Sequence, residues 1–160
     1  MRQLIGSMAG IFCWLSVAAA QDLAVSGAWL RATAPGQVSG SLQFSIASTK
    51  ESKLVAVTSP VAGTVEFHSM THENGMMKMR AIEFIALPAG TKVDLAASGK
   101  HVMLVGLKQP LVVGDSVPFM LTVQFADNSK ATINASADVR SLTASHEMNH
   151  QHEMKGMPGK

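Results

Sequence analysis

Cysteine and tyrosine are nearly absent from this 160-residue chain, which has one cysteine, Cys13, and no tyrosine. Cys13 lies in an N-terminal segment that we expect to be removed, so the remaining chain would have no thiol and no disulfide. A thiolate nucleophile, a zinc site built on cysteine and a blue-copper electron-transfer site are therefore excluded together. Without disulfides, the fold must depend on its hydrophobic core.

Charge is also sparse, because only 15% of the residues are charged and the formal net charge is +2. The basic residues are scattered, whereas a nucleic-acid-binding surface needs them clustered, so no nucleic-acid partner is predicted. The chain shows no nucleophile beside a base and no phosphate-binding loop. Glu66 and Glu73 are acidic neighbours of His68, but we interpret both as facing solvent. No catalytic residues and no organic cofactor site are predicted, and the protein is not expected to be an enzyme.

The N-terminus has the pattern of an export signal that spans residues 1–20. Arg2 supplies a positive charge, an apolar run follows, and Ala18-Ala19-Ala20 resembles a signal-peptidase site. The apolar run is too short to span a bilayer comfortably, and Cys13 follows bulky Phe12, which disfavours lipid attachment. We therefore expect a periplasmic protein whose mature form begins at Gln21 and has no membrane span.

The mature chain is predicted to be all-β, because short segments rich in valine and leucine alternate with turn signals. An antiparallel sandwich or barrel is the expected architecture. The strongest turn signal is Asn74-Gly75, which is typical of a two-residue hairpin. The predicted strands are Ala24–Leu30, Ser41–Ala47, Lys53–Thr58, Thr64–Met70, Met76–Phe84, Lys92–Ala96, His101–Val105, Val117–Phe125 and Ala131–Ala137.

Composition changes near Ser141, and residues 141–160 are predicted to be a flexible tail after a domain that spans residues 21–140. The tail mixes imidazole with thioether, a set that suits both Cu(II) and Cu(I). We predict that it binds copper through six residues, His146, Met148, His150, His152, Met154 and Met157.

Methionine is unusually frequent, with 11 residues in the whole chain, and it gathers beside histidine. His101 and Met103 are two positions apart on one predicted strand, so their side chains share a face. His68 and Met79 flank the predicted hairpin turn, which would bring them close together. Two imidazoles and two thioethers form a soft ligand set that suits Cu(I) and has little attraction for Mg²⁺ or Ca²⁺. We predict a core Cu(I) site at His68, Met79, His101 and Met103.

These residues and their spacing resemble the PCu(A)C family of periplasmic copper chaperones. That family has a histidine, ten residues, a methionine, twenty-one residues and then His-x-Met, and ten and twenty-one residues separate His68, Met79 and His101 here. The flanking sequences are similar as well, notably Gly75–Arg80 and Gly114–Pro118. The chain departs from the family at Gln43-Phe44, where alanine and tyrosine are more frequent, and we expect this to leave the metal site untouched.

The resemblance implies a cupredoxin-like β-sandwich, expected to be a monomer, with His68, Met79, His101 and Met103 as Cu(I) ligands. It also implies a copper-acceptor partner, either subunit II of cytochrome c oxidase with its CuA centre or another oxidase assembly factor. Met70 and Met77 would lie near the site, either as spare ligands or, as we favour, as hydrophobic packing. The sequence leaves one alternative open, a copper-sequestering tolerance protein that uses the same residues without a dedicated oxidase acceptor.

Overall fold

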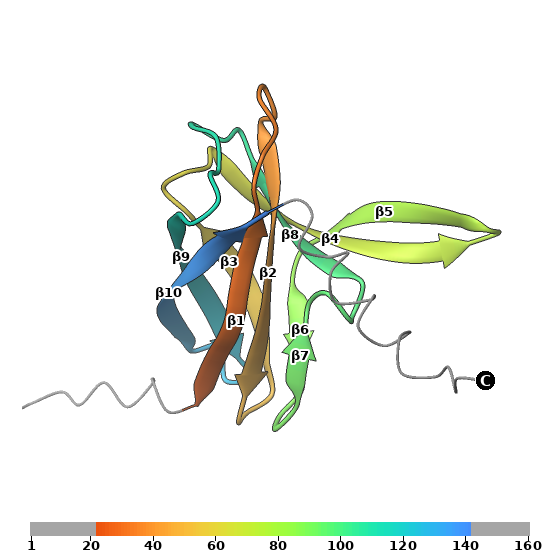
Figure 1. Cartoon of the computed structure of the whole chain (residues 1–160). Helices are drawn as coiled ribbons and strands as arrows, with labels where there is room; N and C mark the ends of the chain where they lie inside the picture. Colours follow the sequence, from red (N-terminus) through yellow and green to blue (C-terminus); the bar gives the residue numbers. More distant parts are fainter. Residues whose placement is uncertain (1–21, 142–160) are drawn as a thin grey trace, which may run out of the picture.

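The computed structural model describes residues 22–141, which form strands joined by turns (Figure 1). The predicted leader and the predicted tail after Ser141 lie outside these residues. Ten strands are present: β1 (Leu23–Arg31), β2 (Ser39–Ser48), β3 (Ser52–Thr58), β4 (Thr64–Glu73), β5 (Met76–Ile82), β6 (Ile85–Leu87), β7 (Lys92–Asp94), β8 (Lys100–Val105), β9 (Ser116–Phe125) and β10 (Lys130–Arg140).

The all-β prediction is confirmed, and a strand occurs in each of the nine predicted segments. One prediction needs correction, because the strand predicted over Met76–Phe84 ends at Ile82 and a short strand that was not predicted follows it. β5 ends at Ile82, and the chain starts β6 at Ile85, which pairs with β3 instead of β4. The chain changes partner there because Ile85 and Leu87 are fully buried in the core, and their burial favours the new position.

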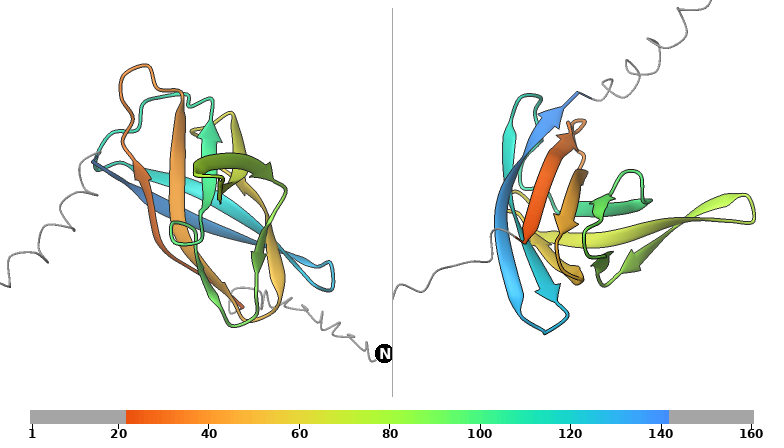
Figure 2. Two further views of the ribbon diagram at one scale, coloured as in Figure 1. Left: turned by 90° about the vertical axis from the view of Figure 1, so that its right-hand side faces the viewer. Right: turned by 90° about the horizontal axis from the view of Figure 1, so that it is seen from below.

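The strands follow one hydrogen-bonded path in the order β5-β4-β8-β2-β1-β10-β9-β3-β6, and β7 pairs with β2. All pairs are antiparallel except β1 with β10, which run parallel. The path curls back on itself, so that β3 and β4, distant along it, contact each other (Figure 2). A hydrophobic core fills the space inside the curled sheet.

Alternation along the strands decides which side chains enter this core. In β8, Val102 and Leu104 are 0% and 1% exposed, whereas His101 and Met103, which alternate with them, are only half-buried on the outer face. Each large aliphatic side chain buried in this way contributes about 1.5–3 kcal/mol. Because adjacent residues of a strand point to opposite faces, the core positions of β8 also determine which side chains remain outside.

The outer part of the β4–β5 hairpin extends away from the body of the domain (Figure 1). Its turn is formed by Asn74 and Gly75, whose φ angles are +52° and +77°. Two successive positive φ values define the tight turn that matches the twist of a hairpin, and Asn-Gly is the preferred sequence for it. The predicted turn is confirmed, and it pairs Glu73 with Met76.

Among residues 22–141, no helix has the length and hydropathy required to cross a membrane.

Candidate metal centre

The predicted ligands His68 and His101 lie directly opposite each other on the paired strands β4 and β8. The neighbouring pair, Phe67 and Val102, is buried in the core, so the two histidines point to the other face. Directly opposed residues of an antiparallel pair have their Cβ atoms about 4.5–5.5 Å apart. Two imidazoles that are 33 positions apart in the sequence are therefore neighbours on the outer face.

Met103 and Met79 complete the predicted set from two different strands. Met103 follows His101 by two positions on β8 and therefore shares its face, opposite Glu66. Met79 lies on β5 opposite Met70, so it is diagonal to His68 instead of facing it. Diagonal neighbours are about 7–8 Å apart, a distance that a long methionine side chain can cover.

Three of the four predicted ligands line one surface hollow, and His68 lies beside it on the adjacent strand. The wall of the hollow is completed by residues of β1 and β2. One of them is Trp29, whose ring lies 5.5 Å from the Arg140 guanidinium. Met79 is 52% exposed at the rim, whereas His101 and Met103 are half-buried. The lining residues are Trp29, Arg31, Ala32, Gln37, Ser39, Gly40, Ser41, Gln43, Met79, His101 and Met103.

Gln43, where the chain departs from the family pattern, reaches the predicted site. The expectation that this departure leaves the metal site untouched is therefore wrong. Its amide nitrogen lies 3.0 Å from Nδ1 of His101 and donates to Ser41 Oγ at 3.1 Å. Gln43 is only 7% exposed, and its Oε1 has no hydrogen-bond partner among the described residues. Nδ1 of His101 is therefore engaged by Gln43, which leaves Nε2 as the ring nitrogen available to a metal.

Glu66 holds the other histidine, because its Oε2 lies 2.9 Å from Nε2 of His68. This contact leaves Nδ1 as the available nitrogen of His68. Glu66 is about half exposed, and Glu73 lies farther out, where it forms ion pairs with Lys78 at 3.1 Å and Arg80 at 3.2 Å. Each carboxylate is therefore engaged with a neighbouring side chain at the surface.

The chemistry of this face is soft and nearly neutral. Within residues 22–141, no group of three or more histidine, cysteine, aspartate or glutamate side chains could hold a metal ion. A metal site on this face must therefore use the methionines, and thioethers favour soft ions such as Cu(I) over Zn²⁺, Mg²⁺ or Ca²⁺.

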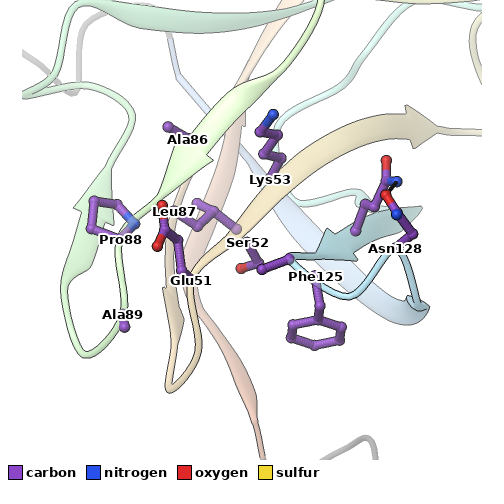
Figure 3. Close-up of a pocket in the computed structure, with 11 residues that line it drawn as sticks. Glu51, Ser52, Lys53, Ala86, Leu87, Pro88, Ala89, Phe125 and Asn128 are labelled. Atoms are coloured by element: carbon purple, nitrogen blue, oxygen red, sulfur yellow. Dashed lines mark hydrogen bonds between the residues drawn. The ribbon is translucent and has the colours of Figure 1, made fainter.

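Another surface pocket lies elsewhere, between β3, β6 and the end of β9 (Figure 3). Its wall contains Glu51, Lys53, Phe125 and Asn128 but no histidine or methionine. The carboxylate, ammonium and amide groups there form no recognisable catalytic or metal-binding arrangement. The soft face, in contrast, combines ligand chemistry with a shared hollow, and we take it as the candidate site.

The sequence reasoning missed two residues that the structure brings to this face, Gln43 and His72. His72 lies opposite Met77, with its Nδ1 3.2 Å from the methionine sulfur. The predicted strand ended at Met70, whereas β4 continues to Glu73. The available signal was the spacing of four residues from His68, since even spacing on one strand places both side chains on one face. Met77 is 59% exposed, so the expectation that it serves as hydrophobic packing is wrong. The six tail ligands lie outside the described residues.

The fold and this face describe an all-β, cupredoxin-like domain. The family described as "Putative lipoprotein LpqE-like" matches residues 23–137, and the chain belongs to that family. Its relatives include the putative lipoprotein Lxx21020 of Leifsonia xyli, which is 30% identical over 71% of this chain and 68% of that protein. Uncharacterized protein RP573 of Rickettsia prowazekii is 32% identical over a match that spans 66% of this chain and 61% of that protein.

Solved structures support the cupredoxin-like fold. The Cu(I) form of DR1885 from Deinococcus radiodurans is 33% identical and matches 77% of this chain and 83% of its own, with a TM-score of 0.56. The metal-free PCuAC domain of PmoF1 is 27% identical and matches 74% of this chain and 95% of its own, with a TM-score of 0.56. The resemblance to PCuAC domains therefore extends from the sequence motif to the fold.

Proposed function

We propose that this protein is a periplasmic copper chaperone that binds Cu(I) through His68, Met79, His101 and Met103. The observation that carries the proposal is the convergence of four soft side chains from three adjacent strands on one face. The similar structure of DR1885, described as its Cu(I) form, supports the choice of metal. Neutral nitrogen and thioether ligands stabilise the singly charged ion without placing a thiol in an oxidising compartment.

The accessibility of the site suits transfer better than storage or electron transfer. Met79 is 52% exposed at the rim, so an acceptor protein can approach the ion from that side and exchange one ligand at a time. We propose an acceptor in oxidase assembly, cytochrome c oxidase subunit II with its CuA centre or another assembly factor. Copper sequestration for tolerance is the second candidate, because the same ligands would serve it.

The periplasmic location belongs to the same proposal and depends on the predicted export signal. The family and the Leifsonia protein are both described as putative lipoproteins, which supports a location in the cell envelope. Fractionation of cells that produce the full chain, with mass measurement of the mature N-terminus, separates release at Gln21 from lipid attachment at Cys13.

The decisive experiment is an anaerobic Cu(I) titration of the full chain against a competing chelator. His101→Ala and Met79→Leu should weaken the tightest Cu(I) site by more than the roughly 10–100-fold that loss of a supporting outer-shell partner costs. Met120→Leu is the matched control, because Met120 is 39% exposed on β9 and lies outside the face. Unchanged chelator competition in both ligand variants would contradict the assignment.

Chaperone and sequestration functions are distinguished in cells. Deletion of the protein should lower cytochrome c oxidase activity under copper limitation if it delivers copper. If it only sequesters copper, oxidase activity should persist, and growth should instead become sensitive to excess copper.

A further inference from the structure

The β4–β5 hairpin carries a second group of soft ligands beyond the four of the proposed site. β4 pairs with β8 as far as Ser69, and the Met70 N–H still donates to the Gly99 carbonyl at 2.8 Å. Only the part of the hairpin beyond Met70 is paired with itself alone, and it extends from the domain (Figure 1). Met70 pairs with Met79 at the base of this extension, and His72 pairs with Met77 within it. Opposed and alternate residues share a face, so all four side chains lie on the same side of the hairpin.

The opposite face of the hairpin has different chemistry. It presents Glu73 together with Lys78 and Arg80, joined by ion pairs of 3.1 Å and 3.2 Å. The charges of the extension are thus gathered and paired on one side, and the side with histidine and methionine is left without formal charge. An uncharged face of imidazole and thioether groups is the environment that Cu(I) prefers.

The contact between His72 and Met77 already has the dimensions of a ligand pair. Nδ1 of His72 lies 3.2 Å from Sδ of Met77, and both side chains are exposed. Typical metal bonds are about 2.0 Å to imidazole nitrogen and about 2.3 Å to sulfur, so their sum exceeds this separation. One ion can therefore reach both atoms without movement of the strands. The sulfur of Met70, diagonal to Met77, is within side-chain reach as a third ligand.

We propose that His72, Met77 and Met70 form a second Cu(I) site on the outer part of the hairpin. It adjoins the four-ligand site through Met79, which lies opposite Met70. Copper can thus pass along one face, from His72 and Met77, past Met70 and Met79, to His68 and His101. This step rests on the proposed function only in that Met79 belongs to the four-ligand set. The ion keeps its charge throughout, and only ligands are exchanged.

The test follows the methionine methyl groups and histidine rings of the full chain by NMR during anaerobic addition of Cu(I). The signals of Met79 and Met103 should shift with the first equivalent of Cu(I). Those of Met77 and His72 should shift at a higher ratio of Cu(I) to protein. The double variant His72→Gln, Met77→Leu should bind one Cu(I) equivalent fewer than the unmodified protein. Met76→Leu is the matched control, since Met76 is 61% exposed but lies opposite Glu73, on the charged face.

The outcomes separate this inference from the proposed function. If Met77 and His72 do not respond up to saturation while Met79 and Met103 do, the hairpin site is overturned and the proposed function stands. That result would point to the exposed methionines as a protein-docking surface instead. If Met77 and His72 respond but Met79 and Met103 do not, the hairpin site is supported and the four-ligand site fails. If the double variant and the Met76→Leu control bind the same number of Cu(I) equivalents, the hairpin site is also overturned.

Discussion

The side-chain amide of Gln43 lies 3.0 Å from Nδ1 of His101, on the strand next to the one that carries the histidine. As placed, the amide nitrogen donates, so Nδ1 accepts and the imidazole proton lies on Nε2. A metal on Nε2 moves that proton to Nδ1, which then needs an acceptor. Rotation of the amide by a half-turn supplies Oε1, the buried oxygen that otherwise has no partner among the described residues.

Replacement of this amide should therefore affect metal binding through His101. Gln43→Leu should lower Cu(I) affinity by about 10–100-fold, the usual cost of losing an outer-shell partner. Gln43→Glu keeps an acceptor for Nδ1–H and should retain most of the affinity. Ser41→Ala serves as control, because it removes only the other partner of the amide. Chelator competition measures all three variants, and equal affinity in Gln43→Leu would contradict a positioning role.

Gly75 is expected to maintain the register that places Met79. Its φ is +77°, and a Cβ added there would meet nothing within 4 Å, so Gly75→Ala tests backbone strain alone. A residue with a Cβ in this region costs about 1–2 kcal/mol, which should open the hairpin about 5- to 30-fold more often. Amide hydrogen exchange in β4 and β5 measures this opening.

Gly36→Ala is the matched control for the hairpin, because Gly36 has a φ of +81° and also faces open space. It should carry a similar strain without faster exchange in β4 or β5. Equal hairpin exchange in the two variants would show that Gly75 does not hold the register.

Asp94 is expected to make stability depend on pH at acid values. Hydrogen bonds from the Ala97 backbone N–H and from Ser45 Oγ, both 3.1 Å long, hold the pKa of Asp94 below its ordinary value of 3.8. A lowered pKa in the folded state stabilises the protein above about pH 3.8, and this stabilisation is lost as pH falls through the folded pKa. The free energy of unfolding of Asp94→Asn should thus be lower than that of wild type by a constant amount near neutral pH. This difference should become smaller in acid.

Urea unfolding of wild type and Asp94→Asn between neutral pH and pH 3 measures that difference. A gap between the two unfolding midpoints that widens in acid would contradict the role of the Asp94 carboxylate.

Removal of residues 142–160 should separate copper binding by the predicted tail from Cu(I) binding by the core site. A tether of this length would hold its six predicted ligands near the core at an effective concentration on the order of millimolar, high enough to capture copper and pass it inward. The shortened protein should lose Cu(II) binding and bind fewer copper ions in total, but it should keep Cu(I) on His68, Met79, His101 and Met103. Titration with each oxidation state measures this, and undiminished Cu(II) binding would argue against the tail site.

Local patterns in the sequence were sufficient for every strand of the described residues except β6, and for one turn. Alternation in β8 separates Val102 from His101 and Met103 because a strand with one buried face has a period of two. Asn74 and Gly75 predicted a two-residue hairpin because both tolerate positive φ. The division between β5 and β6 was missed, since a three-residue strand provides too little periodicity to be recognised.

Which strands became neighbours was decided by the tertiary structure. The sequence supplied four soft ligands at a recognisable spacing, but the opposition of His68 and His101 depends on β4 pairing with β8. The contact of Gln43 with His101 joins residues 58 positions apart, and it depends on β2 lying on the other side of β8. Strand neighbours are selected by burial of a shared core, which is a property of the whole chain, whereas turns and alternation depend on adjacent residues.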